Sequence, residues 1–78
     1  MPTIARAGPY RFFFFSNEGD EPRHVHVQRD EALAKFWLDP VALSSASAFS
    51  PREIARLERL IEERRETFRD AWDDFFRA

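Results

Sequence analysis

The two histidines of this 78-residue chain lie two residues apart, directly after an acidic segment. Side chains two residues apart on a β-strand project from the same face, so we predict that the imidazoles of His24 and His26 stand side by side. Glu18, Asp20 and Glu21 precede them closely and bring carboxylates within reach. Imidazoles and carboxylates transfer protons near neutral pH or bind metal ions. Any catalytic or metal chemistry of the chain is therefore predicted at this segment.

An acid–base pair is the first chemistry that the histidines predict. In metal-free RNA cleavage, one imidazole takes the proton of the 2′-hydroxyl and the other protonates the leaving oxygen. Arg23 and Lys35 would then neutralise the phosphate, and Trp37 would stack on a base. The alternative is a structural role, in which the histidines bind backbone or acidic neighbours and the Lys–Trp pair is cross-strand packing.

Binding of a metal ion is the second chemistry that this segment predicts. The ligands of a bound ion would be His24, His26, Asp20 and Glu18. Zinc needs three or four protein ligands, and the chain has neither a third histidine nor a cysteine. A metal site would therefore recruit carboxylates or a second subunit. We expect no resident metal or other cofactor, because the carboxylates also fit a solvated loop and no nucleotide-binding fingerprint is present.

These residues are predicted to lie in an α+β domain, with a small sheet in residues 1–48 and a helix in residues 49–78. Strands are expected near 3–6, 10–16, 23–29 and 32–38, with a short edge strand at 41–43 and loops at 17–22 and 44–48. Four consecutive phenylalanines at 12–15 indicate a central strand that is covered on both faces. The predicted architecture is a mostly antiparallel sheet of three or four strands followed by one long helix.

The helix has a clear start signal. Ser50-Pro51-Arg52-Glu53 is a capping box with proline at the first helical position. Apolar residues then recur at helical spacing, with a gap at Arg64-Arg65. A helix over 51–77 would be about 40 Å long, whereas a strand of six or seven residues spans about 20 Å. We therefore predict that its second half extends past the sheet and binds a partner or a second copy through Phe68, Trp72, Phe75 and Phe76.

The composition fits one small domain, residues 1–78, in the cytoplasm. The net charge of −2 supplies no global basic field to recruit nucleic acid. Absence of cysteine excludes disulfides and thiolate zinc sites. No apolar run approaches the roughly 18 residues that a membrane span needs, and the first residues lack the apolar core of a signal peptide.

Several short motifs follow one another along essentially the whole chain. They are Pro2-Thr3-Ile4, Gly8 in a turn, the aromatic strand 12–16, the acidic loop 19–22, His24-Val25-His26, Ala34-Lys35-Phe36, Asp39-Pro40 and Phe49-Ser50. In this order they resemble a family of small bacterial proteins, a domain of unknown function with a Gly-Asp-Glu-Pro-Pro-His-Val-His type motif. Arg23 departs from that motif, since it replaces the second proline and adds a charge beside the first histidine.

The resemblance implies a prokaryotic protein whose gene lies beside that of a second small domain, in an arrangement resembling a toxin–antitoxin pair. We therefore predict a component of such a two-gene module, which binds protein and, as the toxin, cleaves RNA at the His-x-His site. Two alternatives stay open. One is a non-enzymatic adaptor or antitoxin that binds through the aromatic helix, and the other is a metal-dependent hydrolase. The expected partners are a second copy, a cognate small protein and RNA, and no membrane.

Overall fold

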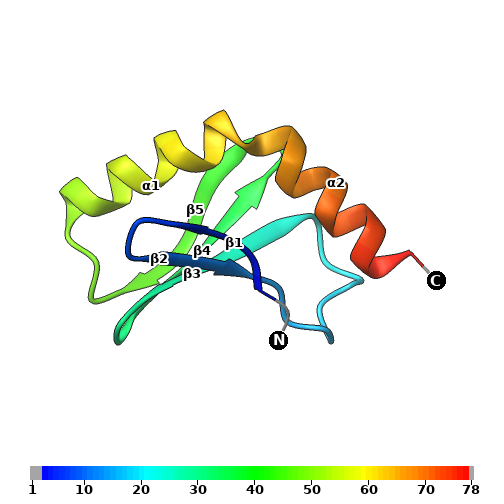
Figure 1. Ribbon diagram of the computed structural model, residues 1–78, viewed down its shortest axis with the longest axis horizontal. Helices are drawn as coiled ribbons and strands as arrows, with labels where there is room; N and C mark the ends of the chain where they lie inside the picture. The colour runs from blue at the N-terminus through cyan, green and yellow to red at the C-terminus, as the bar shows by residue number, and fades with distance from the viewer. Residues whose placement is uncertain (1–2, 78) are drawn as a thin grey trace.

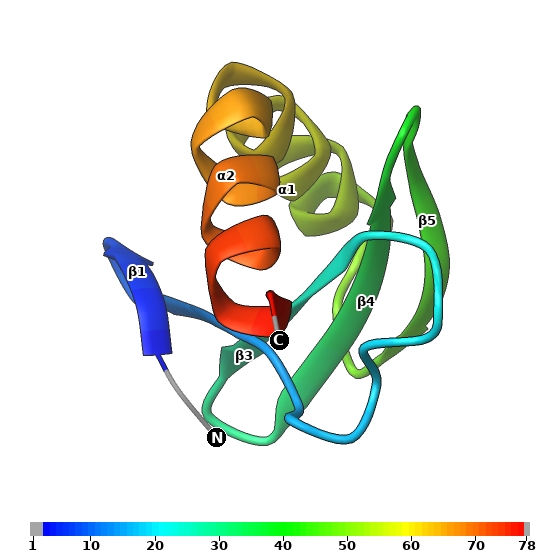
Figure 2. The same ribbon diagram turned by 90° about the vertical axis from the view of Figure 1, so that its right-hand side faces the viewer.

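A computed structural model describes residues 3–77 as a five-stranded sheet that curves around two helices on one of its faces (Figure 1, Figure 2). The strands are β1 (Thr3–Ala7), β2 (Tyr10–Phe13), β3 (His24–Arg29), β4 (Ala32–Leu38) and β5 (Val41–Ser47), and the helices are α1 (Pro51–Glu63) and α2 (Arg65–Phe76). The strands lie side by side in chain order and every pair is antiparallel. Pro2 of the opening motif and Ala78 of the predicted segment 49–78 lie outside the described residues.

Two tight turns let consecutive strands pair. Gly8 has a φ of 57° between β1 and β2, in the left-handed region that glycine adopts without a steric penalty. Asp30 has a φ of 53° between β3 and β4, and aspartate tolerates this conformation better than most residues. The turn at Asp30 sets His26 opposite Lys35, and the pairing of β2 with β3 sets it opposite Phe13 on the other side.

The prediction of three or four strands is wrong, because the described chain forms five strands. The fifth was expected only as a short edge strand at 41–43, but β5 continues through 44–47, which were expected to be a loop. The sequence Ser44-Ser45-Ala46-Ser47 has poor intrinsic β-propensity. It is nevertheless extended because it pairs with β4, with Ser45 opposite Lys35 and Ser47 opposite Leu33. Pairing with a neighbouring strand therefore decides the structure here, and single-residue propensity does not.

The prediction of one long helix is also wrong. The helix ends at Glu63, because Arg64 adopts φ −112° and ψ 17° and thereby ends one helix and begins the next. This break falls where the apolar stripe is interrupted. It lets α2 stay on the sheet, so that the ring centroids of Phe68 and Phe12 lie 5.1 Å apart and those of Trp72 and Phe14 lie 5.3 Å apart.

The core lies between the sheet and the helices. Phe12, Val25, Val27 and Phe36 face the helices and are fully buried. The phenylalanine-rich strand β2 is internal, between β1 and β3, although β3 is the middle strand. Phe13 points to the opposite face and is still buried, because Arg11, Phe15 and His26 cover it.

The start of α1 is tied to the sheet by its cap. Ser50 Oγ accepts a hydrogen bond from the Glu53 backbone N–H at 3.1 Å, which satisfies one free donor of the first turn. The carboxylate of Glu53 accepts two hydrogen bonds from the guanidinium of Arg29 on β3 and one from the Tyr10 hydroxyl on β2. The predicted capping segment thus also fixes where the helix sits on the sheet.

Candidate functional site

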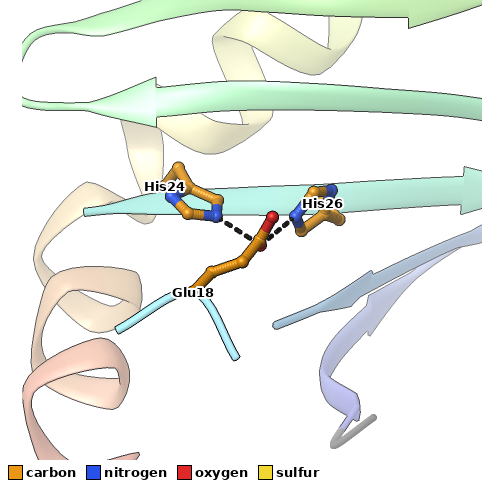
Figure 3. A group of neighbouring side chains, drawn as sticks. All are labelled: Glu18, His24 and His26. Carbon is orange, nitrogen blue, oxygen red and sulfur yellow. Dashed lines mark hydrogen bonds and ion pairs between the residues drawn. The ribbon is translucent and has the colours of Figure 1, made fainter. Parts of the chain in front are cut away.

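One carboxylate and both imidazoles converge at the end of the sheet where β3 begins (Figure 3). Nε2 of His24 and Nε2 of His26 each lie 2.7 Å from the same oxygen, Oε1 of Glu18. The nitrogen and oxygen atoms that these three residues offer all lie within 4.8 Å of one another. The structure therefore brings the predicted histidine pair together with one of the predicted carboxylates.

The loop between β2 and β3 presents Glu18 to the histidines. A turn holds the loop, with backbone hydrogen bonds from Glu18 N–H to Phe15 O at 3.3 Å and from Glu21 N–H to Glu18 O at 3.1 Å. Gly19 packs tightly under the end of α2, where an added Cβ would lie 2.7 Å from a ring carbon of Phe76. A larger residue at position 19 would therefore require the Phe76 ring or the loop that carries Glu18 to shift.

His24 is fully buried, and its ring is held between two tryptophans. Its ring centroid lies 4.7 Å from that of Trp72 on α2 and 5.6 Å from that of Trp37, its partner on β4. Nδ1 lies 2.9 Å from the carbonyl oxygen of Pro22, while the nearer carboxylate oxygen of Glu21 is 3.9 Å away. A carbonyl only accepts hydrogen bonds, so these partners assign a proton to Nδ1.

That assignment leaves an electrostatic problem at the other nitrogen of His24. In the neutral ring, Nε2 then carries a lone pair, and it faces Glu18 Oε1 at 2.7 Å. An ionised carboxylate also only accepts, so two lone pairs would meet without a donor. The contact is favourable only with something positive between the atoms. That is either an additional proton on the imidazole or carboxyl group, or a metal ion.

The charge states of the other two groups suit a metal ion. Burial lowers the pKa of His26, and this outweighs the hydrogen bond and charge of Glu18, so the ring is neutral at neutral pH. Burial raises the pKa of Glu18, but its interactions with the two imidazoles outweigh burial and hold the pKa below its usual value. A neutral imidazole and an ionised carboxylate are the forms that bind metals.

His26 also forms part of a groove on the open face of the sheet. Its ring stacks on Phe13 with centroids 5.4 Å apart and meets Phe15 edge-on at 4.6 Å. Beyond it lies a groove of about 280 Å³ whose walls are mostly apolar and include Leu33, Lys35 and Ser45. Side-chain exposure is 13% for His26 and 19% for Glu18, so the site reaches solvent through these two residues.

The predicted phosphate contacts are already paired with carboxylates. Arg23 donates two hydrogen bonds of 2.8 Å to Asp73 of α2 and a third of 3.1 Å to Asp39. Lys35 Nζ lies 2.7 Å from Glu21 Oε1 and 4.6 Å from the ring centroid of Trp37. Lys35 and Trp37 do share the strand face of the histidines, opposite His26 and His24. Their positions fit the prediction, but both cations are neutralised.

Asp20 lies on the exposed part of the loop and is not among the three clustered ligands. The four aromatic residues of the predicted partner surface have different environments. Phe68 and Trp72 are buried in the chain's own core, with 1% and 5% exposure, and Phe76 is partly buried against it. Phe75 keeps 40% of its surface exposed. A partner surface on the helix remains a prediction that would depend mainly on Phe75.

Three contributors to the site were not predicted from sequence. The carbonyl of Pro22 orients His24, Trp72 covers it, and Phe13 stacks on His26. The pairing of Phe13 with His26 follows from the β2–β3 register, which sequence does not determine across a ten-residue loop. The position of Trp72 depends on the break at Arg64.

Neither helix in the described part of the chain is long and apolar enough to cross a membrane. No curated protein and no solved structure matches the chain. A family model matches residues 10–73, which include both strands of the histidine face, the acidic loop and most of both helices. The chain belongs to the family described as Domain of unknown function (DUF4160).

Proposed function

We propose that Glu18, His24 and His26 bind a divalent transition-metal ion and that the protein is a metal-dependent hydrolase. The observation that carries this proposal is the environment of His24, whose Nδ1–H donates to a backbone carbonyl while Nε2 faces a carboxylate oxygen. Metal-binding histidines almost always donate their second ring N–H to a carbonyl, carboxylate or water, which fixes the tautomer that ligates the metal.

The donor set also fits this chemistry. Two imidazoles and one carboxylate are the protein ligands of catalytic zinc sites in several hydrolases, in which water occupies the fourth position. Ligand bonds of about 2.0–2.2 Å at tetrahedral angles place neighbouring ligand atoms roughly 3.3 Å apart. The two contacts of 2.7 Å at Glu18 Oε1 would therefore lengthen by about 0.6 Å on binding, and the loop residue Glu18 is the ligand that can move.

The open coordination position would hold the reacting water. Since His26 and Glu18 are the partly exposed ligands, this position lies toward solvent and the groove beside His26. A bound zinc ion lowers the pKa of its water to about 7, which supplies a nucleophile at neutral pH. A substrate in the groove would present its scissile bond to that water, with Phe13 and Phe15 as apolar contacts.

Metal-free RNA cleavage, the first function predicted from sequence, has weaker support. It needs two solvent-accessible imidazoles and free cations, whereas His24 is fully buried and Arg23 and Lys35 are each bonded to carboxylates. A toxin–antitoxin-like module would be a biological setting rather than a chemistry, and it is compatible with a metal-dependent hydrolase. The adaptor alternative requires neither histidine and depends on the exposed Phe75.

The experiment is a titration of chelator-treated protein with Zn²⁺, Co²⁺ and Mn²⁺ by calorimetry, followed by hydrolysis assays on RNA and on activated esters and phosphate esters. Glu18→Gln and His26→Ala remove ligands, and Gln28→Ala is the matched control, two residues along the same face of β3. We expect one bound ion for the native chain and for the control. The ligand variants should lose at least about 100-fold in affinity and lose turnover.

Three other outcomes would contradict the proposal and separate the alternatives. Hydrolysis of RNA that survives EDTA would indicate metal-free acid–base catalysis. Metal binding that Glu18→Gln leaves unchanged would place the ion elsewhere. An absence of both metal binding and turnover, in protein shown to be folded by circular dichroism, would favour the non-enzymatic interaction module.

A further inference from the structure

The two edges of the sheet differ in how they discourage pairing with another strand. β1 is five residues long, has an irregularity between Thr3 and Ala5, and carries the charged Arg6. β5 is seven residues long and contains neither a charged residue nor a proline. Short length, irregular pairing and charge are the usual protection of an edge strand. The β1 edge has all three, while β5 has an irregularity at Ser44 but is longer and carries no charge.

Most residues of the β5 strand remain exposed although the strand pairs with β4. Leu43, Ser44, Ser45, Ala46 and Ser47 are all exposed, so neither face of the strand is covered along most of its length. Within residues 3–77, no strand pairs with its outer side, because β5 is the last strand of the sheet, at the right of Figure 2. The outward backbone N–H and C=O groups therefore form a row of free hydrogen-bonding groups.

Exposed apolar side chains lie beside this edge. Leu33 and Leu43 are 46% and 44% exposed, and they are two of the three large hydrophobic residues exposed in the described chain. Leu33 is the second residue of β4 and lies opposite Ser47, and Leu43 lies within β5 opposite Phe36. An added strand would cover apolar surface here and also complete the backbone pairing.

We propose that a second copy of this chain pairs with β5 through its own β5, in antiparallel orientation, to form a continuous ten-stranded sheet. An antiparallel pair of identical strands is related by a two-fold axis, so the same surface serves both copies. Like charges facing each other destabilise such a pair, and the absence of charge over Val41–Ser47 avoids this in every register. A partner strand of different sequence would have no charged residue of β5 to pair with, so β5 has no charge that favours such a partner over a second copy.

The pairing also affects the groove on the open face. The two-fold axis stands perpendicular to the sheet, so the open faces of both copies point the same way. Ser45, Ala46 and Ser47 line the groove and also form the pairing edge. The partner's β5 would therefore run along the outer wall of the groove and extend it toward the second copy. This inference does not depend on the metal ion or on hydrolysis.

The test is the mass in solution, measured by sedimentation equilibrium over a concentration series that reaches hundreds of micromolar. The native chain should approach twice its 9.2 kDa mass as concentration rises. Ser44→Lys with Ala46→Lys adds two like charges to the edge and should remain at 9.2 kDa. Ser44 is the residue that the β4–β5 irregularity leaves without a partner on β4, which favours folding of this variant.

The matched control is Ala55→Lys with Thr67→Lys, which adds the same charges to exposed helix positions and should dimerise as the native chain does. A native chain that stays monomeric throughout the series would overturn the proposal, and so would an edge variant that dimerises normally. Hydrogen exchange of the native chain gives a second readout that needs no variant. Backbone amides of Val41–Ser47 should become at least several-fold more protected at high concentration, and unchanged protection would overturn the proposal.

Discussion

The two faces of the sheet are made by alternate residues of the same strands, and they differ in what covers them. On one face, Val25, Val27 and Phe36 meet the helices and are fully buried. On the other, His26, Lys35 and Leu33 remain partly exposed around a groove. Strand β3 contributes to both faces. A shift of one residue in its register would turn the histidines toward the core and the valines toward the open face.

This difference teaches that the core determines where the site is. The burial of the valines requires a single register, and that register places both imidazoles on the open face. Mutations on the covered face should therefore change mainly the stability of the fold, whereas mutations on the open face should change mainly ligand binding. His24 is the exception, because Trp72 of α2 lies against its ring and buries it.

The largest effect is expected within the covered face. Phe36→Ala removes a fully buried ring and should lower the free energy of unfolding by about 3–5 kcal/mol. Leu33→Ala, three residues earlier on the open face of the same strand, should change it by no more than about 0.5 kcal/mol, as expected for an exposed position. Urea denaturation monitored by circular dichroism compares the two. Equal losses would remove the distinction between the faces.

For the open face, the expected effect is a gain in stability when a metal ion binds. At a zinc concentration about 100 times the dissociation constant, binding to the native state adds about 2.7 kcal/mol of stability, or roughly 10–20 °C in melting temperature for a domain of this size. The shift should disappear in His26→Ala and persist in Gln28→Ala. Thermal melts with and without zinc measure it. A shift retained by His26→Ala would move the ion to another place on the chain.

A smaller loss of stability is expected at the N-terminal cap of α1, which attaches the helices to the sheet. Ser50→Ala removes the side-chain acceptor of the α1 cap and should cost about 1 kcal/mol. Ser16→Ala, at an exposed loop position, is the control and should stay within about 0.5 kcal/mol of the native chain. Chemical denaturation resolves this difference. A cap variant as stable as the control would show that α1 is held by packing alone.

The smallest effect concerns the ion pairs that join α2 to the start of β3 and to the turn between β4 and β5. A hydrogen bond from Arg69 lowers the pKa of Asp39, and one from Arg23 lowers that of Asp73. A folded-state pKa below the unfolded value stabilises the fold at neutral pH, and this stabilisation is lost as pH falls below 3.8 through the folded-state values. Asp39→Asn with Asp73→Asn should therefore be less stable than the native chain at pH 7.

The stability difference between that double variant and the native chain should shrink as pH falls below 3.8, because the native carboxylates then become protonated. Free energies of unfolding across a pH series measure the difference. A difference that stays constant down to low pH would assign the effect to lost packing rather than to the ion pairs.

The histidine face could be predicted from sequence because strand alternation is a local property. His24 and His26 had to share a face once 23–29 formed a strand, and the cap at Ser50 is likewise a local signal. The sequence did not predict that Glu18, rather than Asp20, contacts both imidazoles. This depends on the turn at Phe15 and on the packing of Gly19 under Phe76.

The errors in the fold have a common physical cause. Strand β5 and the break at Arg64 are both decided by contacts with distant parts of the chain. Ser45 becomes extended because Lys35 lies opposite it, and α2 changes direction because Phe68 and Trp72 have core to cover. Neither β-propensity nor helical periodicity carries information about these distant contacts.

The most direct test of the central claim is a crystal structure of the zinc-treated chain with anomalous diffraction data collected at the zinc absorption edge. We predict one anomalous peak bonded to Nε2 of His24, Nε2 of His26 and a carboxylate oxygen of Glu18, at about 2.0–2.2 Å from each. Nδ1 of His24 should keep its hydrogen bond to the Pro22 carbonyl. An ordered zinc ion elsewhere, or Glu18 still hydrogen-bonded to both imidazoles with no metal between them, would contradict the account.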